Sequence, residues 1–289
     1  MVRLNFILFY LMRTVKNYKV RIIISKIQSL VKGKISLQTE RKSLFDNVNT
    51  ELKVNELITY GFTELGIISN NNLTERIISY SKGLKLYDPF NRKGGSFDIE
   101  EIKEKSNVAM FFREDLVKSY DILELANDPA ILNIVQEFLG VKPTISNINM
   151  WWSFSNRLKA ENAQLFHRDL DDFRFCKLFI YLTDVGENDG PHTFVKGSTI
   201  SNQLTKIRRY EDEEIEDVFG KENIIHFIRP KFSAFLVNTF GFHKGTLPID
   251  NDRLLLQIQY SINPIGIEKY NPIKVDHNYN KYINRLITK

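Results

Sequence analysis

At 289 residues, with 43% hydrophobic and 26% charged residues, the chain has the composition of a globular protein with a large buried core. Its single cysteine, Cys176, excludes an internal disulfide framework and a cysteine-based metal cluster. The net charge of +5 is concentrated in residues 1–35, which hold eight basic residues and no acidic one, so the rest carries −3. A slightly acidic body gives no reason to expect nucleic acid as a partner.

Residues 1–48 are predicted to form a basic amphipathic arm and a polar linker. Apolar residues between Val20 and Val31 recur at three- and four-residue steps, as in an amphipathic helix. Two interpretations stay open: residues 1–35 make a peripheral membrane contact, or they pack on the body or on a partner subunit. No apolar run reaches the ~20 residues that span a bilayer. We therefore expect a cytoplasmic protein, membrane-associated under the first interpretation, and its oligomeric state is left open.

The compact domain is predicted over residues 49–270, followed by a C-terminal tail over 271–289. Its first part is mostly helical, with helical patterns from Val54 to Leu65 and from Asn71 to Tyr80. A further helix follows Asp128, because aspartate is a favoured N-cap, proline is favoured in the first turn, and a glycine ends the apolar pattern.

From Thr144 onward, short β-branched or aromatic runs are separated by turn residues. The predicted strands are Ile145 to Phe154, Gln164 to Asp169, Lys177 to Thr183, Thr193 to Lys196, Ile224 to Ile228, Phe232 to Val237 and Arg253 to Ser261. This order predicts a mainly β protein with flanking helices, in the form of a jelly roll, or double-stranded β-helix. The strands from Lys177 and Arg253 each have one aliphatic face, which fits burial under helices. Their mixed faces fit the inside of a jelly roll or, alternatively, solvent.

One tripeptide suggests a metal site. His167 and Asp169 are two residues apart, and a strand turns every second side chain to the same face. Both side chains can then point at one ion. His243, which follows a remote strand, would complete a set of two histidines and one carboxylate. This set leaves coordination positions open and is diagnostic of non-haem Fe(II) oxygenases.

Two other histidines, His192 and His226, are alternative third ligands. We favour His243 because Arg253 follows it by ten residues, at the start of the final strand. The planar guanidinium group of an arginine can bind both oxygens of the distal carboxylate of 2-oxoglutarate. Neither alternative histidine has an arginine at a comparable distance.

The motifs resemble those of the phytanoyl-CoA dioxygenase family over about residues 50–265. The resemblance rests on Phe166-His167-Arg168-Asp169, Leu178 through Val185, Asn188 through His192, Lys196-Gly197-Ser198 and the segment from His243 to Tyr260. It implies a double-stranded β-helix that uses Fe(II), 2-oxoglutarate and O2. By motif position, His167, Asp169 and His243 match the metal ligands, and Arg253 matches the arginine that binds 2-oxoglutarate.

The resemblance implies a dioxygenase that hydroxylates a C–H bond of a small, carrier-linked or lipid-linked metabolite, in surface-glycan or secondary-metabolite biosynthesis. Tyr181 and Gln257 are candidates for lining its cofactor pocket, and Trp151 and Trp152 either help to close the substrate cavity or pack in the core. The carboxylate of Asp169 favours hydroxylation, because related halogenases replace it to make room for halide. Two other functions stay open: a non-catalytic binding module tethered by the arm, and a cupin-type metal enzyme that does not use 2-oxoglutarate.

Overall fold

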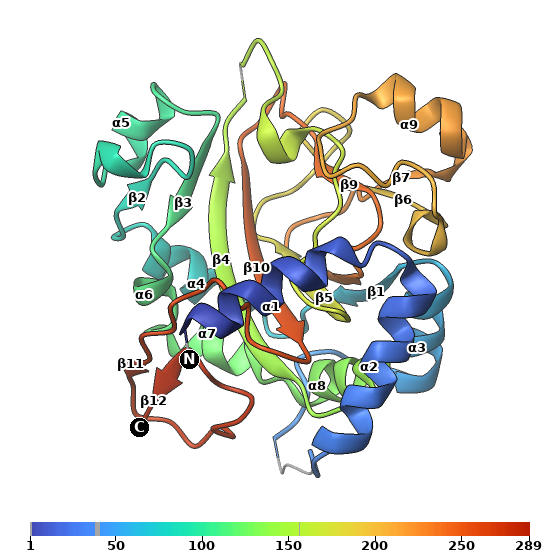
Figure 1. Ribbon diagram of the computed structural model, residues 1–289. Helices are drawn as coiled ribbons and strands as arrows, with labels where there is room; N and C mark the ends of the chain where they lie inside the picture. The colour runs from blue at the N-terminus through green and yellow to red at the C-terminus, as the bar shows by residue number, and fades with distance from the viewer. Residues whose placement is uncertain (1, 38–40, 156) are drawn as a thin grey trace.

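The computed structural model describes residues 2–37, 41–155 and 157–289, so residues 38–40 of the predicted linker lie outside the described part. In this part, a large antiparallel sheet has the strand order β1-β8-β5-β10-β4-β3-β2 (Figure 1). Its strands are β1 Phe62–Ile67, β2 Leu86–Tyr87, β3 Val108–Phe111, β4 Thr144–Ser153, β5 Phe175–Tyr181, β8 Ser233–Val237 and β10 Arg253–Ser261. The predicted mainly β architecture with flanking helices is confirmed.

Helices cover one face of the large sheet. They are α3 Thr50–Thr59, α4 Asn71–Ser81, α7 Tyr120–Ala126 and α8 Pro129–Leu139, with the shorter α5 Ile99–Lys103 and α6 Arg113–Leu116 near the strands β2 and β3. The largest apolar cluster joins Leu57 and Phe138 of the helices to Leu178 and Leu256 of the sheet. The aliphatic faces of β5 and β10 are thus buried under helices, as their sequence pattern predicts.

The other face of the large sheet packs on a small sheet. The small sheet has the order β7-β6-β9 and is antiparallel, with β6 His192–Val195, β7 Ile224–His226 and β9 His243–Gly245. Phe179 and Phe235 of the large sheet contact Phe194 and Phe227, and the rings of Phe227 and Phe235 stack at 4.3 Å. Because β5 and β10 are buried on both faces, the alternative that their mixed faces meet solvent is wrong.

The helix predicted after Asp128 is confirmed in detail. The side chain of Asp128 accepts hydrogen bonds from the backbone N–H groups of Ala130 and Ile131, and Gly140 ends the helix in the left-handed conformation at φ 74°. The helix predicted from Asn71 to Tyr80 is also present, as α4.

The helix predicted from Val54 to Leu65 is wrong in its second half. The α-helix ends at Thr59, Gly61 follows with φ 88°, and Phe62–Ile67 forms β1, which pairs with β8. The spacing of apolar residues within this segment cannot predict β1, because β1 forms by pairing with β8, about 170 residues later in the chain.

The strand predicted from Gln164 to Asp169 is wrong as a continuous strand. Residues 162–164 form a short 3-10 turn, and only Phe166 and His167 make bridges, to Tyr210 and His243. The extended backbone needed to orient the two ligand side chains is therefore confined to the residues around His167.

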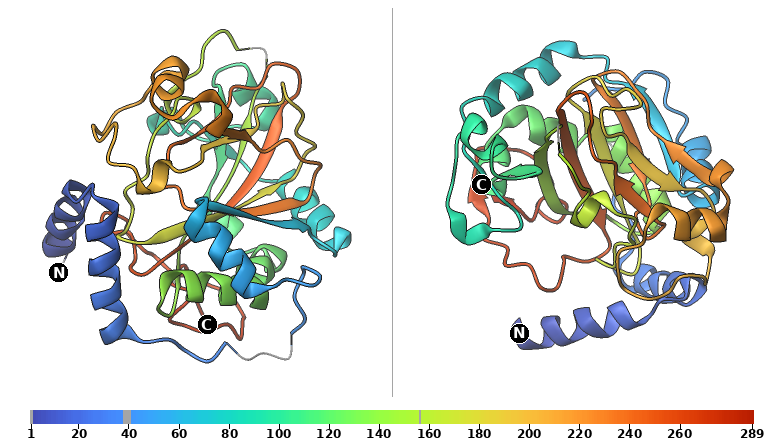
Figure 2. Two further views of the ribbon diagram at one scale, coloured as in Figure 1. Left: turned by 90° about the vertical axis from the view of Figure 1, so that its right-hand side faces the viewer. Right: turned by 90° about the horizontal axis from the view of Figure 1, so that it is seen from above.

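The basic arm forms α1 Val2–Thr14 and α2 Tyr18–Lys32 on the outside of the molecule, and α1 stands apart from the sheets (Figure 2). One side of the arm packs on the body, where Phe9 and Met12 contact Ile265 and the ring of Tyr18 stacks on Phe240 at 5.9 Å. Large apolar side chains are exposed on the rest of the arm: Phe6, Ile7, Leu8, Tyr10, Leu11, Val20, Ile23, Ile27, Leu30 and Val31. Among the described residues, no helix has the length and apolar character to cross a membrane.

The C-terminal residues 271–289 pack on the body. Ile283, Leu286 and Ile287 belong to the largest apolar cluster, and the two short strands β11 Ile273–Lys274 and β12 Ile287–Thr288 pair in parallel. This segment therefore contributes to the core.

Arg21 fixes the arm to the body. Its side chain is fully buried, donates to the carbonyl oxygens of Val15 (2.8 Å) and Asp172, and lies 4.6 Å from the ring centroid of Phe240. Burial lowers the pKa of Arg21 to about 10, so the group still carries its charge at neutral pH.

Replacing Arg21 by methionine should lower the free energy of unfolding by about 2 kcal/mol, because the carbonyl oxygens that it binds would stay buried without donors. Chemical denaturation measures the loss. Lys19→Met makes the same change at an exposed position of the same helix and is the control. Equal stabilities of the two variants would contradict an anchoring role for Arg21.

Candidate metal centre

His167 and His243 lie directly opposite each other. The backbone N–H of each donates to the carbonyl oxygen of the other at 3.0 Å, and their ring centroids are 4.3 Å apart. The backbone N–H of Asp169 donates to the carbonyl oxygen of Thr239 at 2.9 Å. The Nε2 atoms of His167 and His243 are 3.8 Å and 3.3 Å from the nearer carboxylate oxygens of Asp169. One ligand atom from each of the three residues lies within 4.8 Å of the others, so the structure brings the predicted ligands together.

The two imidazole rings present the nitrogen that a metal needs. Nδ1 of His167 lies 2.9 Å from the carbonyl oxygen of Leu165, and Nδ1 of His243 lies 3.0 Å from that of Gly241. A carbonyl oxygen only accepts, so Nδ1 carries the proton and the lone pair is left on Nε2. Burial, assisted by the neighbouring His243, lowers the pKa of His167 to about 3. The ring is therefore neutral at neutral pH, as metal binding requires.

The third ligand is held as an anion. Burial alone would raise the pKa of Asp169, but the charge of Lys177, together with the neighbouring His243, outweighs burial and holds this pKa well below its usual range. The Nζ of Lys177 donates to Oδ2 of Asp169 at 2.7 Å and lies 3.5 Å from Oδ2 of Asp171. Lys177 is only 9% exposed. Its position as the only charged residue of an otherwise apolar strand was the signal in the sequence that could have identified it.

A cavity of about 520 Å³ opens onto the three ligands. Arg253 and Gln257 line it, as predicted, and Trp151 lines it as well. Further side chains in its wall were not identified from the sequence: Met110, Asn149, Ser153, Gln164, Lys177, Phe179 and Arg209. Tyr181, predicted to line the pocket, is absent from the wall formed by the described residues. Its hydroxyl donates to the carbonyl oxygen of Phe227 (3.0 Å) and accepts from the backbone N–H of His192 (2.8 Å).

Arg253 reaches the cavity from the start of β10. It is 2% exposed, and Nη2 donates to the Oγ of Ser153 at 3.1 Å. Its Nε and Nη1 have no hydrogen-bond partner among the described residues. Gly245 leaves space beside it, because a Cβ there would lie 3.0 Å from Nη2. Buried N–H groups without acceptors are unfavourable, so this guanidinium fits a ligand that brings a carboxylate.

The alternative third ligands are placed differently. His192 lines the cavity, with its ring 5.7 Å from that of His243, but it is outside the group of converging ligand atoms. Its Nε2 is buried and has no hydrogen-bond partner in the described part of the chain. His226 is exposed, and its Nδ1 lies 2.9 Å from the Oγ1 of Thr193. The geometry thus favours His243.

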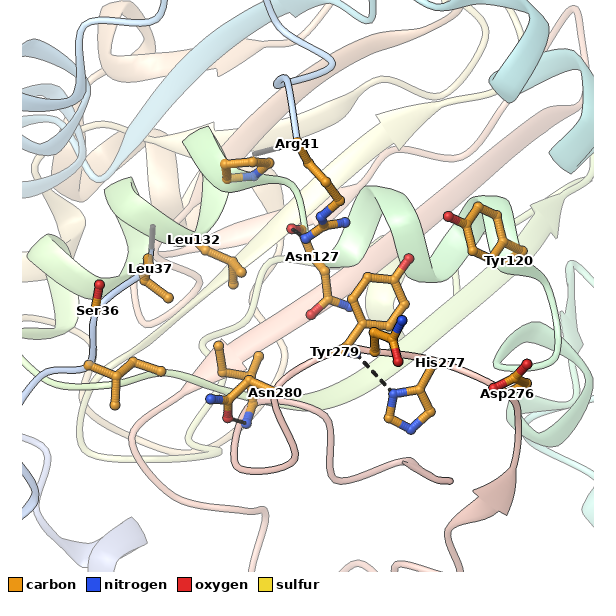
Figure 3. Close-up of a pocket in the computed structure, with 14 residues that line it drawn as sticks. Ser36, Leu37, Arg41, Tyr120, Asn127, Leu132, Asp276, His277, Tyr279 and Asn280 are labelled. Carbon is orange, nitrogen blue, oxygen red and sulfur yellow. Dashed lines mark hydrogen bonds between the residues drawn. The ribbon is translucent and has the colours of Figure 1, made fainter. Parts of the chain in front are cut away.

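A separate cavity of about 620 Å³ lies between residues 35–37 with Arg41, the junction of α7 and α8, and the C-terminal segment (Figure 3). His277 and Tyr279 line it, and the backbone N–H of Tyr279 donates to Nδ1 of His277 at 3.1 Å. The only group of three or more converging metal-ligating side chains in the described part of the chain is the one around His167. The candidate site is therefore the cavity of about 520 Å³ at His167, although it is smaller than this one.

No protein-family model matches the chain, and no curated protein does either. The resemblance to the phytanoyl-CoA dioxygenase family accordingly stays a prediction. Solved structures do match. HygX from Streptomyces hygroscopicus, solved with nickel and 2-oxoglutarate bound, is 16% identical with a TM-score of 0.56, over 81% of this chain and 94% of HygX.

Two further structures are similar. SnoK, a non-heme alpha ketoglutarate dependent carbocyclase from nogalamycin biosynthesis, is 15% identical with a TM-score of 0.53, over 76% of this chain and 86% of SnoK. The non-heme monooxygenase ThoJ is 15% identical with a TM-score of 0.51, over 72% of this chain and 76% of ThoJ. At these identities the likeness establishes a shared fold, and the function has to be argued from the site.

Replacing His243 by alanine should weaken Ni(II) binding by more than about 100-fold, because changes to residues that merely support a ligand already cost up to that factor. His192→Ala removes an imidazole from the same cavity and should change the affinity only a few-fold. Competition with a chromophoric chelator measures both affinities. The reverse order of effects would make His192 the third ligand.

Proposed function

We propose that the chain is an Fe(II)- and 2-oxoglutarate-dependent dioxygenase with a jelly-roll core, which hydroxylates a C–H bond of a small or carrier-linked substrate. The observation that carries the proposal is the convergence of His167, Asp169 and His243 beside a buried guanidinium whose Nε and Nη1 have no acceptor among the described residues. Two histidines and one carboxylate leave coordination positions open, which is the donor set of non-haem Fe(II) oxygenases.

Each residue of the site would have a distinct part. The Nε2 atoms of His167 and His243 and one oxygen of Asp169 would hold the metal, while Lys177 binds the other oxygen and restrains the carboxylate. Arg253 would bind the distal carboxylate of 2-oxoglutarate. When bound, the iron, 2-oxoglutarate and O2 supply the oxidising chemistry, with succinate and CO2 as coproducts. His167, His243 and Arg253 are buried, so their polar atoms face the cavity and not bulk solvent.

The similar structures support a setting in small-molecule biosynthesis. SnoK acts in nogalamycin biosynthesis, and HygX has also been solved with hygromycin B bound. The fold serves more than one outcome, since SnoK is a carbocyclase and ThoJ a monooxygenase. The carboxylate of Asp169 argues against halogenation, because related halogenases replace it, and among the other outcomes we propose hydroxylation. The unpaired N–H groups of Arg253 argue against a cupin-type enzyme that does not use 2-oxoglutarate.

The Fe(II)-loaded protein should convert 2-oxoglutarate to succinate in an O2-dependent reaction. Arg253→Gln should raise the KM for 2-oxoglutarate by about 30-fold or more, since about 2 kcal/mol of charge-assisted hydrogen bonding is lost. Metal binding should change little. Arg229→Gln is the control, because Arg229 pairs with Glu64 outside the cavity. A protein that binds iron tightly but never consumes 2-oxoglutarate would contradict the proposal.

We further propose that the arm contacts an anionic membrane surface. The arm combines ten exposed large apolar side chains with basic residues and no acidic one, and these features together suit a helix lying in a membrane interface. The occupant of this apolar surface is then a lipid bilayer, and a second copy of the chain is the alternative.

Co-sedimentation with phosphatidylglycerol vesicles measures this contact. Leu11→Glu should weaken binding by about tenfold, because burial of one leucine contributes about 1.5–3 kcal/mol. Leu158→Glu changes a fully exposed leucine outside the arm and should have no effect. If the unmodified protein stays in the supernatant and forms dimers, the apolar surface is a subunit interface.

A further inference from the structure

A second cavity, of about 370 Å³, adjoins the metal centre. It shares His167, Asp169 and Arg209 with the cavity of the metal centre, so the two cavities meet at the metal ligands. Its walls come from the end of α1, from the segment after Asp169 and from residues 201–209. The arm therefore forms part of an approach to the candidate site.

Basic side chains dominate this second cavity. Four of them form what we call the basic rim: Arg13, Lys16, Lys206 and Arg209. Arg13 and Lys16 are half-buried, and the other two are exposed. Among the described residues, none of the four has a carboxylate within ion-pair distance. This sets them apart from most of the charged groups around the centre.

The other charged groups of this cavity already have partners. Arg208 pairs with Glu214, and Arg168 donates to the carbonyl oxygen of Phe240 at 2.9 Å. The two acidic residues of the cavity, Asp169 and Asp171, both lie against Lys177. The basic rim is therefore an excess of positive charge, which raises the potential of the cavity and attracts anions.

The cofactors of the proposed function would not neutralise this excess. The two positive charges of a ferrous ion and the charges of Arg253 and Lys177 are balanced by Asp169, Asp171 and the two carboxylates of 2-oxoglutarate. The balance is complete at the metal centre without the basic rim. The basic rim is therefore available to an anionic group of the substrate.

We propose that the basic rim binds a phosphate group of the substrate and so directs the rest of the substrate to the metal centre. This inference rests on the proposed function and names its substrate class, a phosphate ester. Phosphate suits the rim because it is multiply charged and offers several oxygens, which match arginine guanidinium and lysine ammonium groups. The ester is either free in solution or part of a lipid headgroup, and the apolar surface of the arm beside Arg13 is compatible with the second source.

Binding of inorganic phosphate tests the proposal. It is measured by calorimetry on the full chain loaded with Fe(II) and 2-oxoglutarate under argon, at an ionic strength held constant with chloride. Saturable binding is expected, and the double variant Lys206→Gln/Arg209→Gln should weaken it by about tenfold or more. Lys19→Gln/Lys26→Gln removes two charges from exposed positions of α2 outside the cavity and should leave the affinity within about twofold.

Two results would contradict phosphate binding by the basic rim. One is that the unmodified protein shows no saturable phosphate binding. The other is that the Lys206/Arg209 double variant still binds phosphate, as it would if phosphate bound the metal itself. Binding of 2-oxoglutarate in the same samples reports separately on the proposed function, because that binding depends on the metal and Arg253. Phosphatidylglycerol vesicles that displace inorganic phosphate would identify a headgroup as the source. If the vesicles bind the arm while inorganic phosphate stays bound to the basic rim, the phosphate ester is a soluble molecule.

Discussion

Two backbone hydrogen bonds between His167 and His243 hold the candidate site together. They join the segment after the 3-10 turn at 162–164 to β9, and they place the two rings side by side with both Nδ1 atoms on backbone carbonyl oxygens. The turn before His243 depends on Gly241, because a Cβ there would lie 2.5 Å from the ring of Phe194. The orientation of both ligands is therefore set by the main chain and by packing between the sheets.

The buried charged groups of the site are also held by contacts within the protein. Buried ions are costly unless they are paired, and Lys177 meets this need for Asp169. Arg253 is the exception, since two of its nitrogens, Nε and Nη1, have no acceptor in the described residues. The arm supports the same region, because Arg21 binds the carbonyl oxygen of Asp172, three residues after Asp169. Although the arm was predicted as a separate segment, it thus supports the loop that follows Asp169.

Much of this site could be predicted from the sequence because short spacings determine it. Alternation along β10 places Arg253 and Gln257 on one face, and the helix after Asp128 has both of its end signals. Alternation gives the face of a strand but not the position along the cavity. Tyr181, which was predicted to line the pocket, lies away from it, whereas Lys177 on the same face of β5 lies at the metal end. Arg209 and Lys16 have no local signal at all, because a loop and the arm reach the site through long-range packing.

The most direct test of the central claim is a crystal structure of the protein grown without oxygen in the presence of Fe(II) and 2-oxoglutarate. The account predicts one ion bound by Nε2 of His167, Nε2 of His243 and a single oxygen of Asp169, with the distal carboxylate of 2-oxoglutarate on Arg253. An ion held elsewhere, or a 2-oxoglutarate molecule that leaves Nε and Nη1 of Arg253 without an acceptor, would contradict it.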